Sequence, residues 1–372
     1  MFNEQNTVEN YVVSLLTGVT PPPVTGRESH EDAAPYIPLG RNHKGAGWHY
    51  VPAASLPRRV NDVFIEAYLR EALIRLNPEI AAQPERADEV LYKLRAIVLS
   101  VRSDGLIRAN EEFTAWLRGE RSMPFGENNQ HVTIHLIDFG DPSLHSGQAS
   151  DNNQYIASTQ VTFRTGAAER RPDLVLYVNG IPLALLEAKT PVRNAVSWVD
   201  GAKQLHDDHD DYEKFIPELF ACNVLNVATE GKDLRYGAIH TPLELWSPWI
   251  VDSLKARLTA SKQNQASVDE EPRVATPPKP DIKQLAESIP NLLRPNLLLD
   301  ILANFTLFAT DKKKRRLKII CRYQQYEGAN KIVQRVLDGV TKKGLIWHFQ
   351  GSGKSLLMVF AAQKLRMASA LR

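Results

Sequence analysis

The chain has 372 residues, of which 43% are hydrophobic and 24% are charged, and its formal net charge is +2. One hydrophobic core seldom organises a chain of this length, so we expect two domains. The composition is typical of ordinary globular proteins. The small net charge excludes a protein that is basic over its whole surface, so any basic surface must be local.

Two cysteines, Cys222 and Cys321, are too few for a disulfide scaffold and fit a reducing compartment. The N-terminal segment MFNEQNTVEN is acidic and polar, whereas a secretory signal begins basic and continues apolar. The sequence has no run of about 18 apolar residues, so we expect no membrane-spanning helix. These observations predict a cytoplasmic protein.

The first 120 residues are expected to be mainly helical. An Asn/Thr capping signal opens a short helix that ends at Gly18, and a proline-rich polar segment follows. Apolar residues then recur near helical spacing, and Pro78 is expected to end the first of these longer helices. The longer helices are predicted at residues 60–80, 87–101 and 110–117.

A series of strand-like segments follows, separated by clusters of Gly, Pro, Asn and Asp. A helix at 196–205, an apolar segment at 219–231 and a short strand at 236–242 come after them. This order predicts an α/β domain with a mixed sheet flanked by helices. The strands are expected at residues 131–139, 154–165, 173–179 and 181–189, within a sheet region of 131–240 and a domain of 1–260.

The composition changes at residues 261–290, where prolines and polar residues dominate, and this segment is predicted to be a linker. The remainder, 291–372, begins with an apolar helix at 296–308 that is predicted to be buried, and it contains an amphipathic helix at 327–340. Between them lies the basic run 312–316, which is either a strip that binds DNA phosphates or a solvated face.

Three charged residues near one hairpin end form the first candidate site. Glu187 and Lys189 are two apart on a strand, so their side chains lie on the same face. A strict two-residue turn at 179–180 would pair Asp173 with residue 186 and send its side chain to the other face. A bulge or a three-residue loop would instead pair Asp173 with Glu187, and the site requires this odd register.

Two carboxylates would supply hard oxygen ligands for Mg²⁺, and a metal-bound water is a better nucleophile at neutral pH. The Lys189 ammonium would orient that water or stabilise developing negative charge. Three charged residues at loose spacing are common, however. By themselves they are more often a surface Glu/Lys pair at a strand end with Asp173 in a turn.

The surrounding sequence resembles the restriction (R) subunit of type I restriction-modification enzymes, whose nuclease belongs to the PD-(D/E)xK family. The resemblance covers most of residues 100–240, and its matching parts are Pro172-Asp173, the turn at 179–183, Glu187-Ala188-Lys189, Pro191, NEEFTAWLRGE, HLIDFGDP and IPELFACNVLNVATEG. It implies a PD-(D/E)xK restriction-endonuclease-like sheet that cleaves double-stranded DNA with Mg²⁺. Asp173, Glu187 and Lys189 would be catalytic, and the two acids would bind the metal.

This family also carries a QxxxY signature, and Gln204 resembles its glutamine. Four residues later the chain has Asp208, and the nearest tyrosine is Tyr212. Tyr212 would replace the family tyrosine only if the helix continued to it. The intervening His and Asp residues at 206–211 could be read as a metal site. They are interpreted instead as a solvated acidic face, because adjacent residues on a helix point in different directions and could not bind one ion together.

The segment LIWHFQGSGKSLLMVF passes from an apolar strand through a glycine turn into a helix, as a nucleotide-binding loop requires. His348 stands where the general loop has its first glycine, but the form WHxQGSGKS resembles the type I restriction motors. The resemblance implies an ATP site in a RecA-like motor lobe. Its residues would be Gln325, which would contact adenine, and Gly351, Gly353, Lys354 and Ser355, which would hold phosphate and Mg²⁺.

A complete ATP-driven translocase needs a second carboxylate motif, an arginine and a second lobe, all beyond residue 372. We therefore expect the N-terminal part of a longer subunit or a naturally truncated product. The resemblance implies modification and specificity subunits as partners, and little cleavage by this part alone. A non-catalytic DNA-binding or assembly module, and an autonomous ATPase, are the alternative interpretations.

Overall fold

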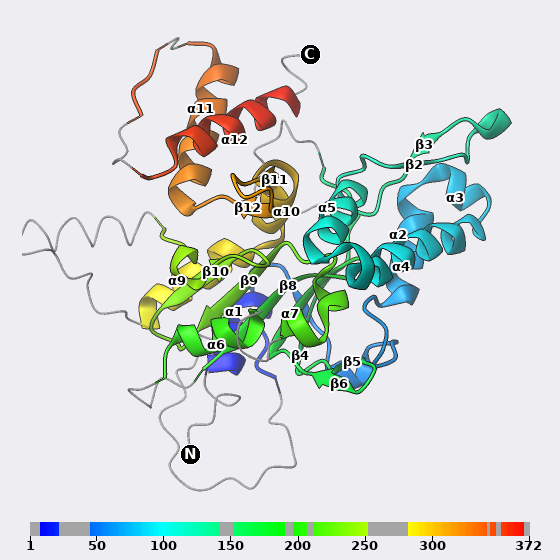
Figure 1. Ribbon diagram of the computed structural model, residues 1–372, viewed down its shortest axis with the longest axis horizontal. Coiled ribbons are helices and arrows are strands. Elements are labelled where there is room, and N and C mark those ends of the chain that lie inside the picture. The colour runs from blue at the N-terminus through cyan, green and yellow to red at the C-terminus, as the bar shows by residue number, and fades with distance from the viewer. Residues whose placement is uncertain are drawn as a thin grey trace, which may run out of the picture.

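The centre of the computed structural model is a six-stranded mixed sheet with strand order β1-β4-β7-β8-β9-β10 (Figure 1). Within it β1 pairs parallel with β4 and β8 pairs parallel with β9, while the other neighbours are antiparallel. The strands are β1 (His49–Tyr50), β4 (Tyr155–Thr159), β7 (Leu174–Val178), β8 (Ile181–Ala188), β9 (Leu225–Thr229) and β10 (Leu234–Gly237). The structure describes residues 8–21, 45–140, 152–189, 196–206, 212–251, 282–340, 343–346 and 351–367.

Every residue of β4, β7, β8 and β9 is buried. Strands that are covered on both faces read as continuous apolar runs, which explains why β7 and β8 show little alternation of apolar and polar residues. Helix α6 (Trp198–Leu205) packs on β8 and β9, and α1 (Asn10–Thr17) packs near β1 and β4. The expected α/β fold with a mixed sheet flanked by helices is confirmed.

The predicted N-terminal helices are present and lie together at one side of the sheet (Figure 1). The first of them ends at Leu76, just before Pro78, as predicted, and Pro78 begins a separate helix. Proline suits this first helical position because its missing N–H would have no partner there. The helices are α2 (Glu66–Leu76), α3 (Pro78–Ala82), α4 (Arg86–Asp104) and α5 (Leu106–Leu117).

The prediction of a strand at 131–139 is largely wrong. Only β3 (Val132–Thr133) forms there, paired with β2 (Ser122–Met123). Beyond it, the backbone N–H of His135 donates to Asn77 Oδ1 at 2.7 Å instead of to a neighbouring strand. Ile134, Leu136 and Ile137 of this segment are buried, so burial produced the strand-like pattern without a β-ladder.

Several short elements connect the larger ones. The segment predicted as one strand at 154–165 is divided between β4 and a separate hairpin strand. The short elements are η2 (Ala53–Ser55), η3 (Glu127–Asn129), β5 (Phe163–Thr165), β6 (Ala168–Arg170), α7 (Tyr212–Phe215), η4 (Pro217–Phe220) and η5 (Leu243–Leu245), where η marks a 3-10 helix.

The predicted linker, 261–290, lies outside the described residues up to 281. Its last part belongs to helix α9 (Ile282–Leu293), which packs against α1. Leu285, Ile289 and Leu292 of this helix are buried. The indole N–H of Trp48 also donates to the carbonyl of Leu293 at 2.6 Å. This end of the predicted linker is therefore a packed helix.

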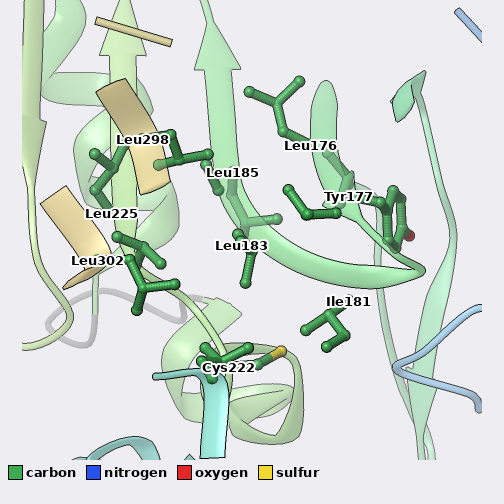
Figure 2. Close-up of a cluster of buried hydrophobic side chains, with 14 of the residues drawn as sticks. Leu176, Tyr177, Ile181, Leu183, Leu185, Cys222, Leu225, Leu298 and Leu302 are labelled. Atoms are coloured by element: carbon green, nitrogen blue, oxygen red, sulfur yellow. The ribbon is translucent and has the colours of Figure 1, made fainter. Parts of the chain in front are cut away.

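Helix α10 (Pro295–Asn304) is buried against the central sheet. Leu298 and Leu302 of this helix lie beside Leu183, Leu185 and Leu225 of β8 and β9 in one apolar cluster (Figure 2). The segment that follows α10 comprises β11 (Thr306–Thr310), β12 (Arg316–Ile320), α11 (Tyr323–Asp338) and α12 (Lys354–Met367). The chain on both sides of residue 261 thus contributes to one core.

The β11–β12 hairpin is joined to the sheet domain by polar contacts. Arg316 forms a bidentate ion pair with Glu111 of α5, and Arg118 Nη2 donates to the carbonyl of Thr306 at 2.6 Å. Lys318 is buried and its Nζ donates to the carbonyl of Asn223. In the hairpin turn, the lysines at 312–314 are exposed, so both interpretations of this basic run stay open.

None of the helices in the described ranges is both long and apolar enough to cross a bilayer.

Burial lowers the pKa of Lys318 from its ordinary value of 10.5 to about 7. The unfolded chain therefore binds this proton more strongly, and the folded state loses stability as pH falls from about 10.5 toward 7. We expect Lys318→Met to raise the free energy of unfolding at pH 6.5 by roughly 1–4 kcal/mol. The gain should shrink by pH 9.5, as thermal unfolding at both pH values will show. Lys313→Met, at an exposed position, is the control, and an equal gain at both pH values would contradict the prediction.

Candidate active site

The register of the β7–β8 hairpin decides where the site residues lie. The turn has two residues, Asn179 and Gly180, with φ of 50° and 79°, and Val178 pairs with Ile181. The pairing shifts between residues 176 and 177, because Leu183 is an extra residue on β8 and forms a β-bulge. Its neighbour Pro182 has no N–H to give to a ladder, which favours an irregularity at this point.

Beyond the bulge, Leu174 pairs with Leu186, so the next residue along, Asp173, faces Glu187. The backbone N–H of Ala188 donates to Asp173 Oδ2 at 2.8 Å, which fixes this approach. The odd register that the site requires is therefore present. It arises from a bulge and not from a longer turn.

Asp173, Glu187 and Lys189 come together at the end of this hairpin. Lys189 Nζ lies 3.6 Å from Glu187 Oε2, and both side chains are largely shielded, with exposed fractions of 14% and 1%. The alternative of a solvated surface Glu/Lys pair does not describe this arrangement.

The Glu187 carboxylate is buried with too few partners. Its Oε1 has no hydrogen-bond partner within the described part of the chain. Burial raises the pKa of Glu187 well above its usual range and the neighbouring Asp173 raises it further, while Lys189 opposes both effects. Lys189 compensates an ionised carboxylate in this place only in part, and a bound cation would add the missing positive charge.

Gln204 and Tyr212 join the same cluster. Ser197 and Asp200 form a capping box that starts α6, and this helix carries Gln204 to the site. Lys189 Nζ donates to Gln204 Oε1 at 2.5 Å, and Gln204 Nε2 donates to the hydroxyl oxygen of Tyr212 at 2.8 Å. Gln204 thus links the lysine to the tyrosine.

The expectation that Tyr212 would need a continuous helix is wrong. Helix α6 ends at Leu205, and Tyr212 begins the separate helix α7. The hydroxyl of Tyr212 donates to the carbonyl of Arg171 at 3.3 Å, and burial and the two carboxylates raise its pKa. The spacing of the QxxxY signature changes, yet the tyrosine reaches its glutamine. Most of the predicted acidic face, 207–211, lies outside the described residues.

Sequence reasoning missed Glu9. This residue precedes α1, is buried, and accepts a hydrogen bond through Oε2 from Gln160 Nε2 at 2.9 Å. The same Nε2 donates to Asp173 Oδ1 at 2.9 Å. Burial, with a contribution from Asp173, raises the pKa of Glu9 to about 8. A lone acid before a short apolar helix gives no sequence signal for this location.

The second candidate site brings Gln325 to the glycine turn before α12. Gly351 and Gly353 have φ of 85° and 80°, which glycine adopts without strain. The buried Gln325 accepts from the N–H of Arg322 through Oε1, and its Nε2 donates to the carbonyls of Ser352 and Gly353 at 3.2 and 3.3 Å. Lys354 and Ser355 begin the helix, while His348 lies outside the described residues. The role of Gln325 toward adenine stays a prediction.

Residues 37–244 match the family described as Type I restriction enzyme R protein N terminus (HSDR_N), which is more than half of the chain. The chain belongs to this family. Residues 324–371 match the SWI2/SNF2 ATPase family, so the R-protein region is followed by an ATPase-like segment. The resemblance inferred from the sequence is confirmed.

Named R-protein relatives support the same assignment. The chain is 30% identical over 338 residues to the type I restriction enzyme HindI endonuclease subunit of Haemophilus influenzae, a match covering 86% of this chain and 28% of that protein. It is 27% identical over 337 residues to a candidate type I restriction enzyme MjaIXP endonuclease subunit of Methanocaldococcus jannaschii, covering 86% and 30%. The chain thus spans less than a third of the length of these relatives.

The buried Glu187 of this R-protein region predicts a pH-dependent stability change. Its raised pKa means that the folded state disfavours ionisation, so stability is lost as pH rises above the ordinary value of 4.5. We expect Glu187→Gln to raise the free energy of unfolding at pH 7.5 by roughly 1–3 kcal/mol, with little gain at pH 4. Thermal unfolding of the metal-free chain measures this. The exposed Glu89→Gln is the control, and destabilisation by Glu187→Gln at pH 7.5 would refute the prediction.

Proposed function

We propose that this chain is the nuclease-bearing N-terminal region of a type I R subunit, which hydrolyses phosphodiester bonds of double-stranded DNA with Mg²⁺. One observation carries the proposal. The buried Glu187, one oxygen of which has no hydrogen-bond partner among the described residues, lies with Asp173 and Lys189 at the end of one hairpin. Burying the Glu187 carboxylate lowers the stability of the fold, and charged groups buried in this way are typical of a functional centre.

The residues fit a divalent metal that requires only one or two protein carboxylates. Asp173 and Glu187 would hold Mg²⁺, which usually takes one or two protein carboxylates and keeps water or phosphate as its other ligands. In the described ranges, no group of three or more His, Cys, Asp and Glu is arranged to hold a metal ion. When bound, the metal would supply an activated water and neutralise phosphate charge.

Lys189 would act on the phosphate directly. An ammonium has three N–H donors, and Gln204 Oε1 fixes the direction of one of them. The others would then face a phosphate oxygen or the attacking water, where positive charge stabilises the developing negative charge. Gln204, itself held by Tyr212, would keep the ammonium in this position.

In the complete subunit, ATP hydrolysis would drive DNA translocation, and stalled translocation would trigger cleavage without sequence preference. Gly351, Gly353, Lys354 and Ser355 would hold the ATP phosphates and Mg²⁺, and Gln325 would contact adenine. Modification and specificity subunits would be the partners that read the DNA site. The match to SWI2/SNF2 ATPases and the hydrogen bond from Gln325 to the glycine turn support this proposed ATP site.

Substitution in the full-length subunit, reconstituted with its partners, tests the nuclease. We expect Lys189→Ala to lower double-strand cleavage at least about 100-fold, because one charged group stabilising the transition state contributes that much. ATP hydrolysis should be retained. Lys203→Ala, an exposed lysine of α6, is the matched control and should leave both activities unchanged. Undiminished cleavage by Lys189→Ala would end the nuclease proposal.

A complementary substitution separates the two sites. Lys354→Ala should abolish ATP hydrolysis and translocation-dependent cleavage, because no other lysine lies in the glycine turn. ATPase assays and cleavage of circular DNA measure both effects. Normal ATP hydrolysis by Lys354→Ala would contradict the nucleotide site.

The alternative of a non-catalytic DNA-binding or assembly module loses one of its supports. It drew on the altered QxxxY spacing, yet Gln204 donates to the hydroxyl of Tyr212 despite that spacing. A module without catalysis would leave cleavage unaffected by Lys189→Ala, so the same experiment decides between the two.

A further inference from the structure

We propose that Gln160 is a positioning residue that presets the Asp173 carboxylate for a divalent metal. This inference rests on the proposed function, since it assigns a role toward the same metal. Gln160 directly follows β4, the strand that pairs with β7, and is not part of the nuclease motif recognised in the sequence.

The backbone of Gln160 is the first observation. Its φ is 55°, a left-handed conformation that a non-glycine residue adopts only at a cost in free energy. In this conformation its N–H donates to the carbonyl of Asp173 at 3.1 Å, which extends the β4–β7 pairing by one residue. This backbone hydrogen bond therefore ties the position of Gln160 to that of Asp173.

The side chain is the second observation. An amide group carries two N–H donors on one nitrogen, and Nε2 of Gln160 uses them on two carboxylates. It donates to Asp173 Oδ1 and to Glu9 Oε2, each at 2.9 Å. Two acids that would otherwise repel each other share one neutral donor.

These contacts define the Asp173 side chain from both ends. Gln160 holds Oδ1, and the backbone N–H of Ala188 holds Oδ2 at 2.8 Å. A carboxylate can accept about four hydrogen bonds or metal contacts, so each oxygen keeps a lone pair for a cation. The orientation is fixed while the capacity to bind a metal remains.

The chemical identity of Gln160 supports this role. A lysine or arginine here would neutralise the acids and compete with a cation, whereas a neutral amide leaves their negative charge intact. Groups that orient metal ligands in this way commonly change affinity 10- to 100-fold when removed. A competing interpretation is that Gln160 only anchors Glu9 and helix α1.

Two substitutions separate positioning from anchoring and from backbone strain. Gln160→Ala removes the amide and keeps the strained φ, while Gln160→Gly removes the amide and relieves the strain. We expect Gln160→Gly to melt at a higher temperature than Gln160→Ala. Both should bind Mn²⁺ about 10- to 100-fold more weakly than the wild-type chain, by isothermal titration calorimetry.

Three controls complete the experiment. Lys314→Gly relieves a left-handed φ of 63° in the distant hairpin turn and should leave Mn²⁺ affinity unchanged. Asp173→Asn should remove the binding, which identifies the site. Glu9→Gln keeps a carbonyl oxygen for Gln160 and should retain the melting temperature of the wild type within a few degrees.

The outcomes are distinct. Weaker Mn²⁺ binding by both Gln160 variants, independent of their melting temperatures, supports the proposal. Wild-type Mn²⁺ affinity in both variants overturns it, even where α1 is destabilised, and leaves the nuclease proposal standing. A wild-type chain that binds no Mn²⁺, or binds it equally after Asp173→Asn, overturns both the metal at this hairpin and the role of Gln160.

Discussion

One extra residue in strand β8 determines the candidate site. Because side chains alternate faces with a period of two, the bulge at Leu183 moves Asp173 to the face that carries Glu187. Without it, the tight turn at 179–180 would place the two acids on opposite faces of the sheet. The hydrogen bond from the backbone N–H of Ala188 to Asp173 depends on this register, whereas the one from Gln160 follows from the β4–β7 pairing.

The site concentrates charge where a sheet is otherwise apolar. Strands β7 and β8 are buried along their whole length, so the free energy of the core offsets the cost of the acids at their ends. Lys189 is the one cation that contacts Glu187 within the described residues, and it shares its donors with Gln204. The core thus keeps the acids in place, while Lys189 compensates their negative charge only in part.

The segment after residue 290 is built into the same core as the site. Helix α10 packs its leucines on β8 and β9 (Figure 2), and Lys318 of β12 donates to Asn223, just before β9 begins. At the other end of β9, the carbonyl of Thr229 accepts from the backbone N–H of Lys189 at 2.8 Å. One strand therefore contacts the later segment at one end and the candidate site at the other.

The sequence alone determined the mixed α/β fold, most helices and the shared strand face of Glu187 and Lys189, because these follow from local pattern and spacing. The family followed from the resemblance of its motifs. It misplaced the strand at 131–139, since burial without a β-ladder gives the same apolar pattern. Tertiary structure decided what depends on contacts between distant segments. These are the approach of Asp173 through the bulge, the return of Tyr212 to Gln204, and the arrival of Glu9 from the N-terminal helix. No local pattern encodes such contacts, because register shifts and chain returns are set by the packing of the whole sheet.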